Sequence, residues 1–191
     1  MGEPNAAQKN ALRRQCRRQR AALLPAAQGP LLAIARRELP DLVSAGRRLG
    51  IHWPLAGEPD LRGLEQEPGL RGRLALPRLS NGALHYRAWG EGTPLSPDDT
   101  GIPAPDPGPD LEPQQLALLL VPALACDRQG FRLGYGGGWF DRLRSAAPWR
   151  AVPALVVLPE GCLVEQVPRD PWDVPFDGWL HEGGLHWLRP V

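Results

Sequence analysis

The residues best suited to chemistry lie in segment 132–141, which reads RLGYGGGWFD and contains four glycines. Glycine lets the backbone turn its N–H groups toward an anion such as a phosphate. Arg132 can donate paired hydrogen bonds to phosphate oxygens. Asp141 can be a ligand of the Mg²⁺ that accompanies nucleotide phosphates. The stretch therefore predicts a loop that binds an anion or a nucleotide.

Two interpretations of this stretch remain open on local composition. It could be a flexible turn in which Arg132 and Asp141 are surface charges, because glycine-rich turns are common. Known phosphate motifs do not match it: no lysine follows the glycines, and Trp139 stands where a dinucleotide pattern starting at Gly134 needs its third glycine. The pattern alone therefore does not define the type of ligand.

The elements around the loop favour a ligand site. Segment 115–124, QLALLLVPAL, is an apolar run typical of a strand buried on both faces. Segment 139–147 begins a helix, and loops between such a strand and a helix bind ligands in α/β proteins. We expect further helices at 5–23, ending at Pro25, at 29–45, broken near Pro40, and at 58–66. Segment 48–55 should be a short strand that runs into a loop, and further strands are expected at 151–158 and 178–181. The strands at 73–79 and 83–89 could pair as a hairpin across Ser80-Asn81-Gly82, and 90–113 should be a long loop.

This alternation of helices and buried strands predicts one α/β domain with three layers over residues 1–191. The net charge of +1 gives no global attraction to nucleic acid. No apolar run approaches the roughly 20 residues of a membrane span, and the N-terminus lacks the apolar core of a signal peptide. Three scattered cysteines favour a reducing compartment, so we expect a cytoplasmic protein.

Lys9 is the only lysine among 22 basic residues, and it lies four positions before Arg13. At this spacing on a helix the two side chains share one face. Together with Arg14, Arg17, Arg18 and Arg20, they could also form a solvated basic face or a weak nucleic-acid patch, and local evidence alone favours that interpretation.

Segment 121–143, VPALACDRQGFRLGYGGGWFDRL, closely resembles the signature of the 5-formyltetrahydrofolate cyclo-ligases, also called methenyltetrahydrofolate synthetases. The matching positions are Pro122, Asp127, Gly130, Arg132, Leu133, Gly134, Gly136, Gly138, Asp141 and Arg142. The chain departs from the pattern at Cys126, where phenylalanine is usual, and at the aromatic pair Trp139-Phe140. It departs again at Ala104, where the family often has an acidic residue.

The resemblance implies a mainly parallel sheet in a three-layer sandwich, similar to ribose-5-phosphate isomerase and CoA-transferase domains. It implies ATP- and Mg²⁺-dependent cyclisation of 5-formyltetrahydrofolate to 5,10-methenyltetrahydrofolate, with release of ADP and phosphate. We expect a monomer that binds ATP and this folate, with no nucleic acid or membrane partner.

The resemblance also assigns roles to single residues. Arg132 and Asp141 would be catalytic, and Asp141 and Asp173 would hold the metal. Residues expected to bind ATP are Lys9, Arg13, Arg132, Leu133, Gly134, Tyr135, Gly136, Gly137, Gly138, Trp139 and Phe140. Residues expected to bind the folate are Trp53, Glu58, Tyr135 and Trp139.

Each assignment has a plainer alternative. Glu58 could cap the next helix or merely favour its dipole, Trp53 could belong to the core, and Asp173 could be a turn residue. The four histidines show no ligand or triad spacing and are expected to be structural. At the level of function, the alternatives are a folate- or nucleotide-binding paralogue with altered catalysis, a small-molecule kinase that uses the same loop, and a nucleic-acid-binding module.

Overall fold

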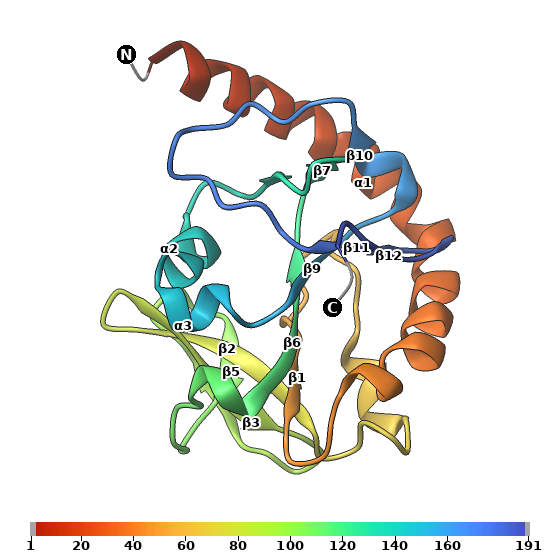
Figure 1. Cartoon of the computed structure of the whole chain (residues 1–191), viewed down its shortest axis with the longest axis vertical. Coiled ribbons are helices and arrows are strands. Elements are labelled where there is room, and N and C mark those ends of the chain that lie inside the picture. The colour runs from red at the N-terminus through yellow and green to blue at the C-terminus, as the bar shows by residue number, and fades with distance from the viewer. Residues whose placement is uncertain (1–2, 190–191) are drawn as a thin grey trace.

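The computed structural model describes residues 3–189 (Figure 1). The domain was predicted over residues 1–191, so its first two residues, Met-Gly, and its last two lie outside the described residues. A seven-stranded sheet has the order β12-β11-β9-β6-β1-β2-β3. Its strands are β1 (Arg48–Gly50), β2 (Leu74–Ser80), β3 (Ala83–Trp89), β6 (Leu116–Pro122), β9 (Ala154–Val157), β11 (Gly178–His181) and β12 (Gly184–Trp187). Neighbouring strands from β11 to β2 are parallel, and only the edge pairs β11–β12 and β2–β3 are antiparallel. The predicted mainly parallel sheet is confirmed.

The two faces of the sheet bury two separate apolar cores. On one face, Leu118 and Leu120 of β6 pack in the cluster that contains Leu31 of the long helix α1 (Glu3–Glu38). On the other face, Leu119 of β6 lies with Leu143 of α2 (Trp139–Ser145), and α3 (Ala147–Arg150) follows on the same side. Alternate residues of β6 therefore enter different cores, which explains its continuous apolar sequence and confirms three layers. Within the described part of the chain, none of the helices combines the length and apolar character that crossing a membrane requires.

Helix α1 corrects the prediction of two helices, at 5–23 and 29–45. The helix runs from Glu3 to Glu38 and continues through Pro25 and Pro30. Both prolines are exposed, so water can reach the carbonyl groups that they leave without a donor. The packing of buried residues such as Leu31 and Ala35 on the sheet holds the helix together across them. The last part of the second predicted helix, after Glu38, forms only a 3-10 turn, η1 (Pro40–Leu42).

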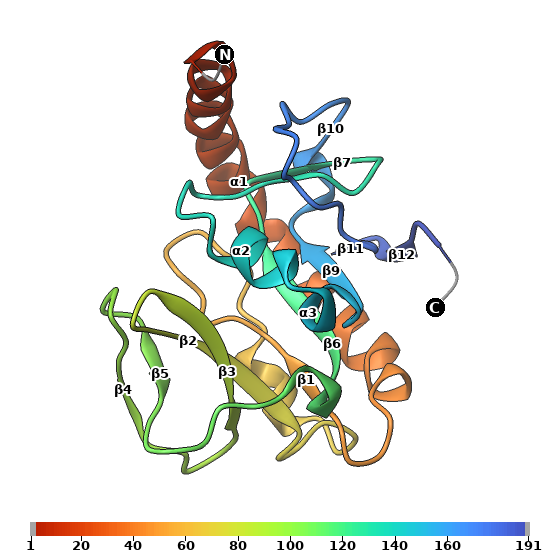
Figure 2. The ribbon, with the colours of Figure 1, turned by 60° about the vertical axis from the view of Figure 1, so that its left-hand side comes forward.

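The loop predicted at 90–113 contains a short hairpin, and in this respect the prediction was wrong. Strands β4 (Leu95–Pro97) and β5 (Pro103–Pro105) pair antiparallel, beside β2 and β3 in Figure 2. Arg87 donates to Asp106 over 3.1 Å, and Asp106 accepts from Ser96 over 2.8 Å. These contacts order a segment whose Pro, Gly and Asp content favours irregular structure. The β2–β3 hairpin itself is confirmed, with Asn81 and Gly82 both in the left-handed region at its turn.

Several other elements are shorter than predicted. The helix expected at 58–66 is a 3-10 helix, η2 (Arg62–Gln66). The short strand expected within 48–55 is β1, and it runs into a loop after Gly50, as predicted. The strand expected at 151–158 is β9, and 178–181 is confirmed as β11, whereas β12 was not predicted. A small second sheet joins β7 (Ala125–Asp127), β8 (Arg132–Leu133) and β10 (Leu163–Val164), and the remaining 3-10 turns are η3 (Pro113–Gln115) and η4 (Glu160–Cys162).

Candidate active site

A cavity of about 800 Å³ opens where the parallel strands β1 and β6 end. Pro122, the last residue of β6, lies in its wall, as do His52 and Trp53, which follow β1. This is the edge at which open parallel sheets bind ligands. The cavity brings together every site residue that the sequence predicted: Lys9, Arg13, Trp53, Glu58, Arg132, Leu133, Gly134, Tyr135, Gly136, Gly137, Gly138, Trp139, Phe140, Asp141 and Asp173.

The glycine-rich loop between β8 and α2 forms one wall of the cavity. Gly136 and Gly138 have φ values of 108° and 65°, which residues with a side chain rarely adopt. A Cβ atom at Gly134 would lie 2.6 Å from the Arg132 guanidinium. Nε of Arg13 donates to the carbonyl oxygen of Gly134 over 3.0 Å, so α1 supports the loop from the other side. The loop thus needs glycine for its conformation and for the close approach of an arginine.

Arg132 is a nearly buried cation in the same wall, with its side chain 6% exposed. Its Nη2 atom lies 3.2 Å from Oδ2 of Asp141, and its guanidinium carbon lies 5.3 Å from the ring centroids of Phe140 and Phe176. Its Nε atom is buried and has no hydrogen-bond partner among the described residues. A fixed arginine with an unused donor beside a glycine loop fits an oxyanion of a ligand.

Lys9 forms a second charged cluster in the cavity wall. Its Nζ atom lies 2.7 Å from both Oδ2 of Asp170 and Oδ2 of Asp173. Burial lowers the pKa of Lys9, but the hydrogen bonds and negative charges of the two aspartates outweigh it and raise the pKa above its ordinary value. Asp173 is therefore a partner of Lys9 here, and Asp170 is a second partner of the same ammonium group.

The metal prediction rests on Asp141 and Asp173, which line the same cavity and each contact a cation. Across residues 3–189, no group of three His, Cys, Asp or Glu side chains is arranged to hold a metal ion. Mg²⁺ that arrives on nucleotide phosphates needs only one or two protein carboxylates. The donor set therefore fits a magnesium ion carried by a nucleotide, and not a dedicated metal site.

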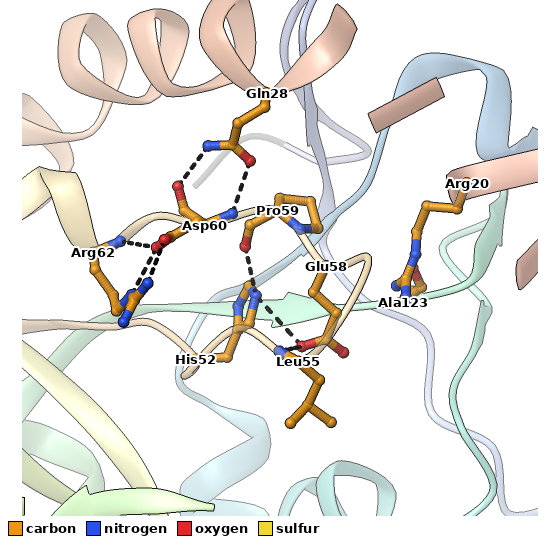
Figure 3. A network of polar contacts seen from close by, with 9 residues as sticks. All are labelled: Arg20, Gln28, His52, Leu55, Glu58, Pro59, Asp60, Arg62 and Ala123. Carbon is orange, nitrogen blue, oxygen red and sulfur yellow. Dashed lines mark hydrogen bonds and ion pairs between the residues drawn. The ribbon is translucent and has the colours of Figure 1, made fainter. Parts of the chain in front are cut away.

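Glu58 and Trp53 come from the loop between β1 and η2, which forms another part of the cavity wall. Figure 3 shows Glu58 in this loop with Leu55, Pro59 and His52. The Glu58 side chain is 2% exposed, and its Oε2 atom accepts from the backbone N–H of Leu55 over 2.8 Å. This hydrogen bond closes the loop that carries Glu58. The residue at the N-cap position of η2 is Leu61, and not Glu58. Arg62 lies 4.5 Å above the Trp53 ring and pairs with Asp60. The alternative in which Glu58 caps the next helix is wrong.

Tyr135 connects the two walls. Burial, followed by the negative charge of Glu58, raises the pKa of its hydroxyl, which stays neutral at all physiological pH values. The hydroxyl is buried beside Glu58 and Arg20, and the Arg20 guanidinium lies 5.2 Å from the ring centroid. Tyr135 thus joins the glycine loop, to which it belongs, to Glu58.

Sequence reasoning missed several residues of the cavity. Asp98, Thr100 and Ile102 come from the β4–β5 turn, which lies in the segment predicted to be a loop without strands. Leu55 and Trp172 are 43% and 71% exposed, and an exposed large apolar side chain is visible only in the structure. His52 was expected to be merely structural, although a polar residue directly after a buried strand was a usable signal. The departures at Cys126 and Ala104 are both fully buried packing positions and do not line the cavity.

Comparison with known proteins gives matches to one family. The sequence model of the 5-formyltetrahydrofolate cyclo-ligase family matches residues 5–182. The chain is 35% identical to the 5-formyltetrahydrofolate cyclo-ligase of Mycolicibacterium smegmatis over 146 residues, covering 71% of this chain and 74% of that protein. It is 29% identical to the Haemophilus influenzae protein of the same name over 138 residues, covering 68% and 73%.

Two solved structures share the fold. The NMR structure of Aquifex aeolicus 5,10-methenyltetrahydrofolate synthetase has a TM-score of 0.74 at 24% identity, covering 96% of this chain and 94% of that chain. The Mycoplasma pneumoniae 5,10-methenyltetrahydrofolate synthetase has a TM-score of 0.65 at 19% identity, covering 91% and 98%. With the match of the sequence model over nearly the whole chain, these findings show that the chain belongs to the 5-formyltetrahydrofolate cyclo-ligase family.

Proposed function

We propose that the cavity binds 5-formyltetrahydrofolate together with ATP and Mg²⁺, and that the chain closes the ring to 5,10-methenyltetrahydrofolate with release of ADP and phosphate. The cyclisation itself follows from membership of the family. The observation that carries the rest is that the glycine loop, with Arg132 and Asp141, lines the same cavity as Glu58. Such a cavity can hold a phosphate donor and its acceptor side by side.

The chemistry explains why a phosphate donor is needed. The formyl oxygen on N5 of the substrate is a poor leaving group. Transfer of the γ-phosphoryl group of ATP to this oxygen releases ADP and makes the oxygen able to leave as phosphate. N10 then attacks the formyl carbon and loses its proton, the C–O bond breaks, and the five-membered ring closes. The protein's task is to position the two substrates and neutralise charge.

On the phosphate wall, we assign Lys9, Arg13 and Arg132 to the oxygens of ATP. Arg132 supports this role with a buried Nε–H that has no partner among residues 3–189. The backbone N–H groups of Gly134–Gly138 would meet the same phosphates. Lys9 would exchange its contacts with Asp170 and Asp173 for phosphate oxygens. That exchange would free Asp173 when the nucleotide binds.

Asp141 and Asp173 are the residues that would hold Mg²⁺ on the nucleotide. The ion would offset the negative charge of the phosphates during transfer. Each of the two aspartates contacts a cation in the structure, so their positions already favour positive charge. Arg132 would remain fixed between Phe140 and Phe176 when Asp141 turns toward the metal.

In the part of the cavity around Glu58, we assign Glu58, Trp53, Tyr135 and Trp139 to the folate. The Glu58 carboxylate can accept hydrogen bonds from N–H groups of the pterin, and the aromatic rings can cover its flat faces. Glu58 is held by the N–H of Leu55, so its orientation is set before the substrate binds. Tyr135 lies between the walls and can contact either ligand.

We further propose that the chain acts as a single domain and a monomer in the cytoplasm, without nucleic acid or membrane partners. The near-neutral net charge supports the absence of a nucleic-acid partner. The three cysteines are buried and unpaired, as expected in a reducing compartment.

The ratio of ADP to product tests this function against its alternatives. Purified protein is mixed with 5-formyltetrahydrofolate and Mg-ATP, and ADP and 5,10-methenyltetrahydrofolate are counted over time. We expect one ADP per product molecule and no ADP without the folate. ADP released together with a stable phosphorylated folate would indicate a kinase. Folate binding without ADP release would indicate a paralogue with altered catalysis.

A further inference from the structure

His52 has a place in the cavity wall that the roles assigned above do not explain. It follows β1 directly after Ile51, lines the cavity and leaves only 3% of its side chain exposed. Figure 3 shows it between Pro59 and Glu58, within the loop that carries Glu58. A polar ring buried at this point must satisfy its hydrogen-bonding groups there.

The contacts of His52 define which ring nitrogen carries the proton. Its Nε2 atom lies 3.0 Å from the carbonyl oxygen of Pro59, and a carbonyl oxygen only accepts, so Nε2 donates. The Oε2 atom of Glu58 lies 3.9 Å from the same nitrogen. Burial lowers the pKa of His52 and outweighs the opposing influence of Glu58, so the ring is neutral. The Nδ1 atom therefore bears a lone pair.

That lone pair has nothing to accept from within the protein. The Nδ1 atom is buried and has no hydrogen-bond partner in segment 3–189. An acceptor left unpaired in the interior costs free energy, which folding would avoid unless a ligand supplies the donor. The cavity next to it is assigned to a pterin, whose edge carries several N–H groups. His52 and Glu58, which both carry acceptor atoms, line this cavity together, as the binding of such a donor-rich edge requires.

We propose that Nδ1 of His52 accepts a hydrogen bond from an N–H group of the substrate's pterin, which makes His52 a substrate-binding residue beside Glu58. The inference rests on the proposed function, because it takes the wall around Glu58 as the folate site. The contact between His52 and Pro59 fixes the tautomer and the orientation that present Nδ1 as an acceptor.

Two substitutions separate this role from simple support of the loop. In His52→Asn the amide reaches only to the position of Nδ1, so an acceptor remains there but the contact with Pro59 is lost. In His52→Gln the amide extends to the position of Nε2, so it can still donate to Pro59 but leaves no acceptor at Nδ1. We expect KM for 5-formyltetrahydrofolate to rise about tenfold more in His52→Gln than in His52→Asn. KM for ATP serves as the internal control in both.

The matched control is His186→Gln on the edge strand β12, which makes the same exchange outside the cavity. It should leave both KM values as in the wild type. If His52→Asn is the more impaired variant, His52 supports the loop through Pro59 and the proposal is overturned. Equal KM values for the two His52 variants overturn it as well.

The nitrogen NMR signal of Nδ1 decides the question if both variants fail to fold. The wild-type chain is labelled with ¹⁵N-histidine, and 5-formyltetrahydrofolate is added without ATP. We expect the unprotonated Nδ1 signal of His52 to shift on addition of the folate and to stay in place when Mg-ATP alone is added. A signal that does not move while the folate binds overturns the proposal. Failure of the proposed function would differ, because the wild-type chain itself would then show no ATP-dependent turnover.

Discussion

Lys9 and Arg132 are the two cations of the phosphate wall whose partners are already carboxylates. Lys9 bridges Asp170 and Asp173, and Arg132 contacts Asp141. The same side chains would hold phosphate and Mg²⁺ in the proposed complex. The protein thus keeps its charges paired without a nucleotide and can exchange each pair for a contact with the ligand.

Lys9→Ala tests this exchange at a single residue. We expect KM for ATP to rise about tenfold or more, because a charge-assisted hydrogen bond to phosphate is lost. KM for the folate should change much less, since the folate is assigned to the residues around Glu58 and not to Lys9. Steady-state kinetics with each substrate varied in turn measure both values, and Lys9→Arg serves as the charge-conserving control. An unchanged KM for ATP would show that Lys9 does not bind ATP and belongs only to a solvated basic face of the helix.

Asp141→Ala tests the metal role. We expect ATP-dependent turnover to fall about a hundredfold or more, because several kcal/mol of charge stabilisation would be lost with the ion. The fold should persist, since the Asp141 side chain is 32% exposed and Arg132 is still held by two aromatic rings. Circular dichroism checks the fold, and Asp99→Ala, at an exposed aspartate of the β4–β5 turn, is the control. Full activity in a folded Asp141→Ala variant would exclude the metal role.

At the scale of elements, the sequence predicted those whose signals are local. The strand at 83–89 and the turn at Asn81-Gly82 follow from alternation and turn chemistry, and the central strand follows from its apolar run. The break expected at Pro25 did not occur, because packing of α1 on the sheet overrides the local preference of proline on its exposed face. The β4–β5 hairpin depends on contacts of Asp106 with distant arginines, which no local pattern encodes.

The β4–β5 turn is held by one carboxylate, that of Asp98. Its Oδ1 atom accepts from the backbone N–H groups of Thr100 and Ile102, and its Oδ2 atom accepts from Leu79 of β2. Asp98→Ala should destabilise the protein by about 1–3 kcal/mol, because these hydrogen bonds are lost. It should also raise KM for the substrates, because Thr100 and Ile102 line the cavity. Urea unfolding and steady-state kinetics measure the two effects. A variant as stable as the wild type would show that the turn does not depend on Asp98.

The same residue predicts how stability depends on pH. Burial raises the pKa of Asp98, but its hydrogen bonds outweigh burial and hold the pKa below its ordinary value of 3.8. Its contribution to stability is therefore present above the unfolded pKa and is lost as pH falls through the lower folded pKa. The difference in melting temperature between wild type and Asp98→Ala should be full near neutral pH and shrink below about pH 3.8. A difference that stays constant into acid would contradict this.

At the scale of the whole molecule, the cavity is assembled from distant parts of the chain. Lys9 comes from α1, Glu58 from the loop after β1, and Asp173 from the segment before β11. The signature around Gly134–Gly138 located one wall from sequence alone. The pairing of Lys9 with two aspartates could not be predicted, because it depends on segments that only the completed sheet brings together.

A site built from the whole fold couples ligand binding to global stability. A non-hydrolysable ATP analogue with Mg²⁺, at a hundred times its Kd, should stabilise the native state by about 2.7 kcal/mol. For a chain of this size the melting temperature should rise by roughly 5–10 °C. Differential scanning calorimetry measures the shift. In Asp141→Ala, most of the rise in melting temperature that depends on Mg²⁺ should be lost. A wild-type rise that is equal with and without Mg²⁺ would contradict a metal-assisted nucleotide site.

The most direct measurement is the near-ultraviolet absorbance of the methenyl product. Purified protein is mixed with 5-formyltetrahydrofolate and Mg-ATP, and a parallel sample lacks ATP. The proposed function predicts a rise in absorbance that requires ATP, with one ADP released per product formed. No rise in the complete mixture, with both ligands shown to be bound, would contradict it and would make this chain a binding protein that keeps the cavity of its family without the ring closure.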